Sequence, residues 1–281
     1  MQMRAMSDLG REPERRAEPQ PKWRICGATD IGLQREQNQD TFVIADLHSG
    51  EITSPCAEVE LSLSDRGFLL LVCDGMGGEA AGEVAAHIAA ASIRENLVEE
   101  GAAVCEHPAE ALQHAVKIAN RAILQEAKMR PEERGMGTTC TAAIVLPGRL
   151  TVAQVGDSRA YLLRGETLHT LTKDQSLAAQ LVDFGVLKPE EVPTFQYRNI
   201  ILQALGSKTP VKPVISDFEL IPGDRVLLCS DGLHGPVPDT EIQAVLSSGG
   251  DLSSTTRALV ARALEAGGPD NVTVVVAEYR A

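Results

Sequence analysis

Three stretches of the chain place an aspartate at the edge of a strongly apolar run. The runs over 67–75 and 224–232 both lead into Asp-Gly pairs, at Asp74 and Asp231, and a third run follows Asp270. Strands that are apolar on both faces are buried, so carboxylates at their ends lie at the rim of a core, where an unpaired charge is costly. Three such carboxylates facing one another would repel unless a cation lay between them. A bound divalent metal is therefore the first hypothesis for function.

The surroundings of these aspartates decide between a metal site and an ordinary turn. Asp-Gly alone is a turn dipeptide. Asp74, however, begins Asp-Gly-Met-Gly-Gly, where the glycines let the backbone crowd a ligand, and Asp157 supplies a fourth acidic strand end in Val-Gly-Asp-Ser-Arg. Mg²⁺ and Mn²⁺ prefer carboxylate, carbonyl and water oxygens, and no His–Cys cluster competes for the ion.

Composition excludes several classes of protein. The net charge of −13 argues against a nucleic-acid binder, because attraction to phosphate needs a basic face. None of the six cysteines has C-x-x-C spacing, so a zinc ribbon or thioredoxin motif is not expected, and those within apolar runs are predicted to be buried. With no signal-peptide core and no run of membrane-spanning length, we predict a cytoplasmic protein with reduced thiols.

The periodicity of apolar residues predicts mixed strands and helices. Residues 1–22 are charged and rich in proline, which predicts a disordered tail before a single domain over 23–281. The chain then looks extended to residue 44, with a polar loop over 34–39 and a hairpin connection over 46–66. The other predicted elements are helices over 82–99, 108–129, 176–184 and 255–266, and strands over 139–146, 150–155 and 160–164, near Val226 and over 272–276. This order indicates an α+β layered fold rather than regular βαβ alternation.

Six motifs in order carry a family resemblance: Arg35-x-x-Asn38-Gln39-Asp40, Asp74-Gly75-Met76-Gly77-Gly78, Gly137-Thr138-Thr139, Gly156-Asp157-Ser158-Arg159-Ala160-Tyr161, Ser230-Asp231-Gly232-Leu233 and Asp270-Asn271. Together they resemble the PPM family, the metal-dependent serine/threonine phosphatases of protein phosphatase 2C type, in their bacterial form. The resemblance spans roughly residues 23–279. It implies a β-sandwich of two antiparallel sheets flanked by helices on both faces, with metals in a cleft at one end.

The resemblance also implies roles for individual residues. Asp74 would bridge two Mn²⁺ or Mg²⁺ ions, and the Gly75 carbonyl would hold one of them. Asp231 and Asp270 would complete the shell of the first ion. The remaining expected site residues are Asp40, which would steady metal-bound waters, Asp157, which would help bind a looser third ion, and Arg35, which would clamp the phosphate. Arg35, Asp74 and Asp231 are the expected catalytic residues.

The residue chemistry fits this expectation independently. Two ions about 4 Å apart can lower the pKa of a bridging water and stabilise in-line displacement at phosphorus. Phosphoryl transfer needs positioning and charge neutralisation more than covalent help. Arg35 offers a planar fork matched to two phosphate oxygens, although an arginine considered alone would be interpreted as a structural ion-pair residue.

Four positions depart from the family pattern or stand beside it. Met76 replaces the histidine that could protonate the leaving oxygen in eukaryotic relatives, and Gln39 stands where they have an acidic residue. Gln175 stands where bacterial relatives often have histidine, which leaves open an effect on proton transfer or on substrate fit. His234, close to Asp231, is the one histidine worth testing as a catalytic participant.

The prediction is a phosphoprotein phosphatase that acts on phosphoserine and phosphothreonine without a phosphoenzyme. We expect a monomer that opposes a serine/threonine kinase, with a flap over about 177–205 that helps to choose the substrate. The C-x₅-R, D-x-D-x-T and P-loop motifs of other phosphate enzymes are absent. Two alternatives stay open: a catalytically silent module that binds a phosphoprotein, and a metal phosphatase for small phosphate esters.

Overall fold

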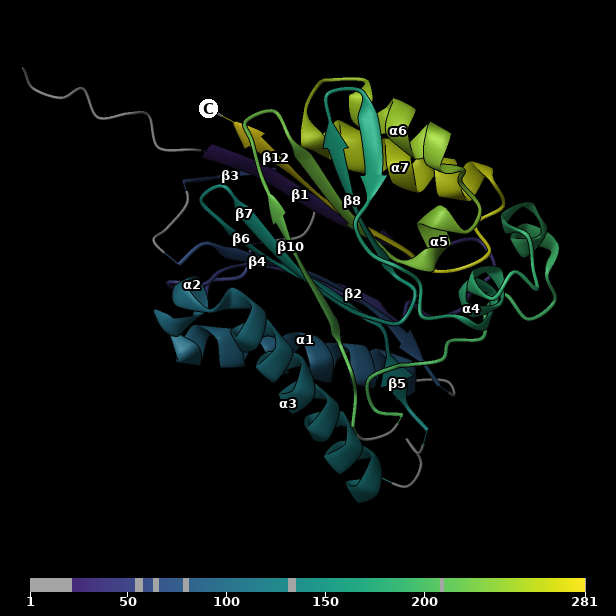
Figure 1. Ribbon diagram of the computed structural model, residues 1–281, viewed down its shortest axis with the longest axis horizontal. Helices are drawn as coiled ribbons and strands as arrows, with labels where there is room; N and C mark the ends of the chain where they lie inside the picture. Colours follow the sequence, from purple (N-terminus) through teal and green to yellow (C-terminus); the bar gives the residue numbers. More distant parts are fainter. Residues whose placement is uncertain are drawn as a thin grey trace, which may run out of the picture.

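The computed structural model describes residues 22–53, 58–62, 66–77, 81–130, 135–207 and 210–280. Two antiparallel sheets pack face to face, and a layer of helices covers the outer face of each (Figure 1). The predicted α+β sandwich with α-β-β-α layers is therefore confirmed. Apart from Lys22, the predicted tail over 1–22 lies outside the described residues.

One sheet has the strand order β3-β1-β12-β11-β8-β9. Its strands, in chain order, are β1 (Lys22–Asp30), β3 (Val59–Ser62), β8 (Arg159–Arg164), β9 (Thr167–Thr170), β11 (Arg225–Cys229) and β12 (Val272–Arg280). The helices α5 (Asp231–His234), α6 (Asp239–Ser247) and α7 (Leu252–Glu265) lie on its outer side (Figure 1). Burial of this sheet on both faces explains the continuous apolar runs in β11 and β12.

The second sheet has the order β10-β7-β6-β4-β2, and β5 pairs with β4 beside it. Its strands are β2 (Asp40–Asp46), β4 (Phe68–Met76), β5 (Gly137–Thr138), β6 (Cys140–Leu146), β7 (Arg149–Val155) and β10 (Val214–Glu219). Its outer face is covered by α1 (Ala81–Glu100) and α3 (Pro108–Met129), joined through the short α2 (Ala103–Glu106). Five alanines of α1 are buried against this layer, because small side chains let a helix approach a sheet closely.

The core between the sheets is mainly aliphatic, and its buried aromatic rings gather at one end. There, Trp23 stacks on Tyr279 with ring centroids 4.8 Å apart and meets Phe68 edge-on at 5.4 Å. These rings lie at the start of β1, the end of β12 and the start of β4. The acidic strand ends therefore lie at the other end of the sandwich. Three of the cysteines, Cys73, Cys140 and Cys229, are buried as free thiols in apolar strands, as predicted.

Most predicted elements are present within a few residues of their expected bounds. The connection over 46–66 does join antiparallel neighbours, β2 and β4, but it also carries β3, which pairs with β1 of the other sheet. The sequence prediction also missed β9, β10, α2, α5 and α6. The missed strands β9 and β10 lie at sheet edges with exposed residues on both faces, so neither has the apolar alternation that reveals a strand.

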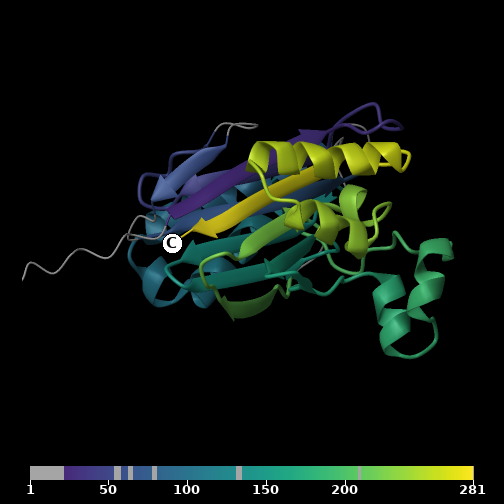
Figure 2. The ribbon, with the colours of Figure 1, turned by 90° about the horizontal axis from the view of Figure 1, so that it is seen from above.

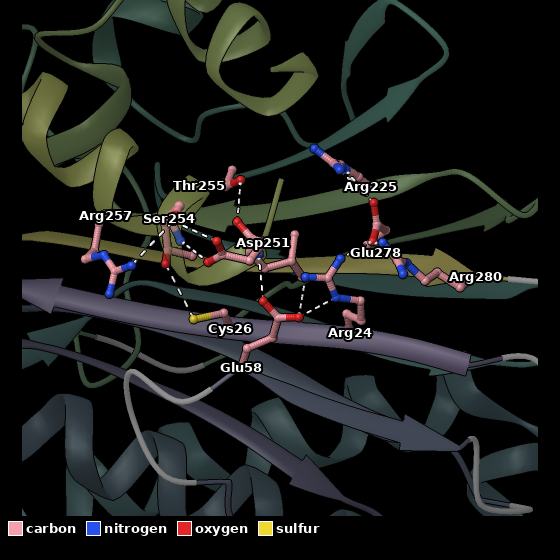
Figure 3. A network of polar contacts seen from close by, with 12 residues as sticks. Arg24, Cys26, Glu58, Arg225, Asp251, Ser254, Thr255, Arg257, Glu278 and Arg280 are labelled. Carbon is pink, nitrogen blue, oxygen red and sulfur yellow. Dashed lines mark hydrogen bonds and ion pairs between the residues drawn. The ribbon is translucent and has the colours of Figure 1, made fainter. Parts of the chain in front are cut away.

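A network of ion pairs fastens one sheet to the helix layer above it (Figure 3). Glu278 of β12 accepts hydrogen bonds from Arg225 at 2.7 Å, from Arg280 at 2.8 Å and from Arg24 at 3.3 Å. Arg24 also pairs with Glu58, which accepts a hydrogen bond from the Leu252 backbone N–H at 2.8 Å. The network thus ties β1, β11 and β12 to the start of α7.

Candidate active site

The predicted acidic residues meet at one end of the sandwich. Asp40 begins β2 and pairs in register with Asp74 near the end of β4. Asp231 follows β11, Asp270 precedes β12, and Asp157 lies in the turn between β7 and β8. In antiparallel sheets the end of one strand adjoins the start of its neighbour, so residues far apart in sequence share this edge. The charges of the other four aspartates all act on Asp74.

Two glycines permit this convergence. A Cβ on Gly232 would lie 1.9 Å from the carbonyl oxygen of Asn271, so α5 could not approach the entry of β12 with any larger residue. A Cβ on Gly75 would lie 2.2 Å from the carbonyl oxygen of Gly82 in α1. The glycine after each aspartate therefore serves close backbone packing around the site rather than a turn alone.

Several carboxylate oxygens at this end are buried without a partner. One oxygen each of Asp40, Asp157 and Asp231 lacks any hydrogen bond, while the other oxygen of Asp40 accepts one from Ser230 Oγ at 2.7 Å. A buried acceptor without a donor is costly. An oxygen-only set of aspartates is the donor set that Mg²⁺ and Mn²⁺ prefer, so these residues fit a divalent metal site.

Burial and mutual repulsion raise the pKa values of these acids. Burial is the largest cause in each case, and it raises the pKa of Asp40 to about 7, of Asp157 to about 8 and of Asp231 to about 6. The pKa of Asp74 rises well above its usual value through burial and then the charge of Asp40. Negative charge is thus crowded here beyond what the protein groups neutralise, and a bound cation would relieve it.

Arg35 lies at the mouth of the site and pairs with Asp270. Its Nη2 is 2.6 Å from Asp270 Oδ2, and about half of the arginine side chain is exposed. This hydrogen bond raises the pKa of the guanidinium, with a smaller contribution from the charge of Asp231. Across the described ranges, no group of three or more His, Cys, Asp or Glu side chains is already placed to hold a metal ion.

A cavity of about 540 Å³ opens at this position. Arg35, Asp74, Gly75, Asp231 and Asp270 all line it, so the structure brings five of the seven predicted site residues to one cavity. We call it the acidic cavity. Asp40 is not among its lining residues. Asp157 lines a second cavity of about 480 Å³, which also includes Asp231.

Asn271 organises the loop that carries Arg35. Its side-chain NH₂ donates to the carbonyls of Ile31 and Gln37, both at 2.9 Å, and its side-chain oxygen accepts from the Gln39 N–H at 2.8 Å. The sequence motifs include Asn271 beside Asp270 but do not predict this role. Its place in the Asp270-Asn271 motif was the signal that could have pointed to it.

Thr138 and Thr139, whose motif also predicted no role, hold Asp74 in place. The Asp74 N–H donates to Thr139 Oγ1 at 2.9 Å, and Thr138 Oγ1 donates to the Asp74 carbonyl at 3.0 Å. Thr139 Oγ1 is also 2.7 Å from Ser158 Oγ, beside Asp157. These hydroxyls connect the Asp74 backbone to the turn that carries Asp157.

The unusual residues take distinct positions. Met76 and Gln39 both line the acidic cavity, and neither can act as an acid there. Gln175 Oε1 accepts from the Gly156 N–H at 3.0 Å and from Gln203 Nε2 at 2.8 Å, so it joins the Asp157 turn to the segment that leaves the flap. His234 Nε2 is 3.0 Å from the Asp157 carbonyl, and burial lowers the pKa of its imidazole to about 4. This neutral histidine holds the Asp157 turn against α5.

Residues 177–205, which we call the flap, project beyond the sandwich (Figure 2). They contain α4 (Leu177–Asp183) and a 3₁₀ helix over Pro189–Thr194. Ser176 caps the start of α4, close to the predicted start of this helix. The base is closed by backbone hydrogen bonds from Leu177 to Ile200 and from Leu202 to Gln175, both 2.8 Å. Asn199 and Ile201 line the acidic cavity, so the flap forms one of its walls.

Comparison with known proteins points to one family. A family model described as protein phosphatase 2C matches residues 58–268. The serine/threonine protein phosphatase PstP of Mycobacterium tuberculosis is 42% identical over 211 residues, which is 75% of this chain and 40% of PstP. The chain thus spans less than half the length of that relative. Protein phosphatase PhpP of Streptococcus pneumoniae is 34% identical over 248 residues, 88% of this chain and 94% of PhpP.

A solved structure agrees with these sequence matches. The catalytic domain of PstP, crystallised in complex with two manganese ions, superposes with a TM-score of 0.77 at 36% identity. The match covers 93% of this chain and all of that domain. In the part of the chain that the structure describes, no helix is long and apolar enough to cross a membrane.

Proposed function

Because the chain belongs to the protein phosphatase 2C family, we propose that it is a Mn²⁺- or Mg²⁺-dependent protein phosphatase that hydrolyses phosphoserine and phosphothreonine. The single observation that carries this proposal is the meeting of five aspartates from distant segments at one end of the sandwich. Three of these aspartates have a buried oxygen that no protein group satisfies. Nothing but a cation would make such a cluster stable in its charged form.

Four residues of the acidic cavity would hold the metals. Asp74, the Gly75 carbonyl, Asp231 and Asp270 supply oxygen ligands from three different segments. Asp40, behind Asp74, would accept hydrogen bonds from the ligand shell, and Asp157 would help to hold a third ion. Two divalent ions at this position supply a water of lowered pKa and neutralise charge that develops at phosphorus.

The protein groups around the metals would bind and orient the phosphate. When a metal occupies Asp270, the Arg35 guanidinium is free to turn from this carboxylate to two phosphate oxygens. The described lining of the acidic cavity has no Ser, Thr, Cys or His side chain, which favours direct attack by water over a phosphoenzyme on such a residue. Met76 cannot supply a proton, so the proton of the leaving oxygen would come from a metal-bound water or from another group at the cavity.

The proposal has three finer parts. The substrates are proteins that a cognate serine/threonine kinase has phosphorylated. The enzyme works in the cytoplasm as a monomer. The flap, which forms a wall of the acidic cavity, helps to choose the substrate.

The test is hydrolysis of phosphopeptides by the full chain with Mn²⁺ and with a chelator. We expect release of phosphate from phosphoserine and phosphothreonine peptides only with metal. Asp231→Asn should lower the rate at least about 100-fold, because even outer-shell changes at metal sites cost about 10- to 100-fold. Circular dichroism of the variant should be unchanged. Faster turnover of sugar phosphates would favour the small-ester alternative, and phosphopeptide binding without turnover would favour the silent module.

A further inference from the structure

A cavity of about 480 Å³ lies beneath the flap, and apart from Asp157 and Asp231 none of its lining residues takes part in the proposed metal chemistry. Helix α4 and the 3₁₀ helix form one side of it, and Arg159, Asp174 and His234 lie on the core side. It shares two lining residues with the acidic cavity, Asn199 and Asp231. A ligand whose phosphate lies at the acidic cavity could therefore extend directly into this flap cavity.

Most charges around the flap cavity neutralise one another. Arg159 forms a bidentate pair with Asp174, with N···O distances of 2.8 and 2.7 Å. Lys173 Nζ is 2.6 Å from Asp183 at the end of α4. Asp157 and Asp231 also line this cavity, and in the proposed function the bound metal ions would neutralise them. The ion pairs and these metals account for every charged lining residue but one.

That residue is Arg198, next to Asn199 in the flap. Its guanidinium donates one hydrogen bond, from Nη1 to the Pro193 carbonyl at 3.1 Å, and within the described ranges it forms no ion pair. An exposed arginine at a cavity beside a phosphate site has donors left for a second anionic group.

The remaining lining is apolar. It consists of small and branched side chains from the two flap helices, namely Ala178, Ala179, Val182, Pro189, Val192 and Pro193. A side chain that suits both parts of this cavity has an aliphatic stem to pack on these residues and a carboxylate to meet Arg198. Glutamate has this combination.

We propose that the flap cavity is a specificity subsite for an acidic residue, best a glutamate, close to the phosphorylated residue of the substrate. Arg198 binds its carboxylate and the apolar residues of the flap pack against its stem. This inference rests on the proposed phosphatase function and adds a substrate class to it. The net charge of −13 makes the preference informative, since the protein as a whole repels acidic peptides.

The test compares pairs of short phosphothreonine peptides that differ only by Glu or Gln. The pair is placed at each of the three positions before and after the phosphothreonine, and kcat/KM is measured with Mn²⁺. For the wild type we expect glutamate to be preferred about 3- to 10-fold at one or two adjacent positions, the range of a partly exposed ion pair with good geometry. Arg198→Gln should bring the Glu/Gln ratio of kcat/KM to about one. Arg198→Glu should invert it, and a Lys peptide at the same position should then become the better substrate.

Lys188→Gln is the matched control, because Lys188 is an exposed cation of the flap that does not line the cavity. It should keep the wild-type Glu/Gln ratio. A ratio of one at every position in the wild type, or equal loss on both peptides in Arg198→Gln, would overturn the subsite. Turnover of an aryl phosphate by the wild type in the same assay shows that such a failure concerns only the subsite. If neither aryl phosphate nor phosphopeptide is hydrolysed, both proposals fall.

Discussion

Asp40 and Asp74 are direct partners across the antiparallel pair of β2 and β4. Like charges placed opposite each other on neighbouring strands destabilise a sheet. Here both side chains are also largely buried from water, and Asp40 has one oxygen that no donor reaches. The fold therefore holds a costly arrangement at its edge that a cation would convert into a stable one.

The first prediction concerns the stability that metal binding confers. Mn²⁺ at about 100 times its Kd should raise the free energy of unfolding by about 2.7 kcal/mol, since the folded site binds it and the unfolded chain does not. Asp74→Asn should remove most of this gain but raise the metal-free value by about 1 kcal/mol, because one of two facing charges is lost. Thermal unfolding with Mn²⁺ and with a chelator measures both. A metal-free variant less stable than the wild type would contradict this account.

The second prediction separates the phosphate clamp from the metal site. Arg35→Ala should raise KM for a phosphopeptide about 10-fold or more, because two charge-assisted hydrogen bonds to phosphate are lost. The concentration of Mn²⁺ needed for half-maximal activity should stay equal or fall, since Asp270 loses its competing partner. Steady-state kinetics at several Mn²⁺ concentrations distinguish the two effects. An unchanged KM would remove Arg35 from phosphate binding.

The third prediction tests the close approach at Gly232. Gly232→Ala places a Cβ 1.9 Å from the Asn271 carbonyl oxygen, so α5 must move away from the entry of β12. The displacement should separate Asp231 from Asp270 and weaken Mn²⁺ affinity at least about 10-fold, as other disturbances around metal ligands do. Gly165→Ala is the control. Gly165 has a positive φ of 59° but no atom within 4 Å of the added Cβ, so backbone strain alone should leave Mn²⁺ affinity intact.

The fourth prediction concerns the arginine network around Glu278, which lies next to Tyr279 at the end of the sandwich opposite the acidic site (Figure 3). Its carboxylate is only 10% exposed and binds three arginines, two of which are 12% exposed. Glu278→Gln should lower the free energy of unfolding by about 3 kcal/mol, because it leaves the buried Arg225 guanidinium without a counter-charge, whereas Arg24 keeps its ion pair with Glu58. Glu265→Gln, which breaks the exposed pair with Arg262, should cost less than about 0.5 kcal/mol. Similar losses in urea unfolding would contradict this difference.

The fifth prediction is the pH dependence of that loss. Burial raises the pKa of Glu278, but hydrogen bonds from Arg225 and Arg280 outweigh it, and the pKa is lowered overall. A carboxyl with a lowered pKa stabilises the folded state above its unfolded pKa and loses that contribution as the pH falls through the folded value. The stability gap between wild type and Glu278→Gln should thus be constant down to about pH 4.3 and close below it. Urea unfolding with a chelator between pH 7 and pH 3 measures the gap, and a gap that widens in acid would refute the assignment.

The sequence alone determined the acidic site and the layered fold to a large extent. Apolar runs that end in Asp-Gly at Asp74 and Asp231 are local patterns, and burial of both strand faces follows from composition without knowledge of the partner strands. Helices α1 and α3 were equally visible, because their apolar residues recur at helical spacing over 20 or more residues. The edge strands β9 and β10 were not, because an exposed strand has no such pattern.

Only the tertiary structure decided which residues meet. The register of β2 on β4 places Asp40 opposite Asp74, and no local pattern in either strand specifies a register between segments 34 residues apart. Two further contacts also join distant segments. Asn271 binds the loop that carries Arg35, and Gln175 binds the turn that carries Asp157. The cavity beneath the flap exists only once α4 is folded against the core. Side-chain chemistry can be read from the order of residues, whereas the distance between two side chains depends on how the sheets pair and pack.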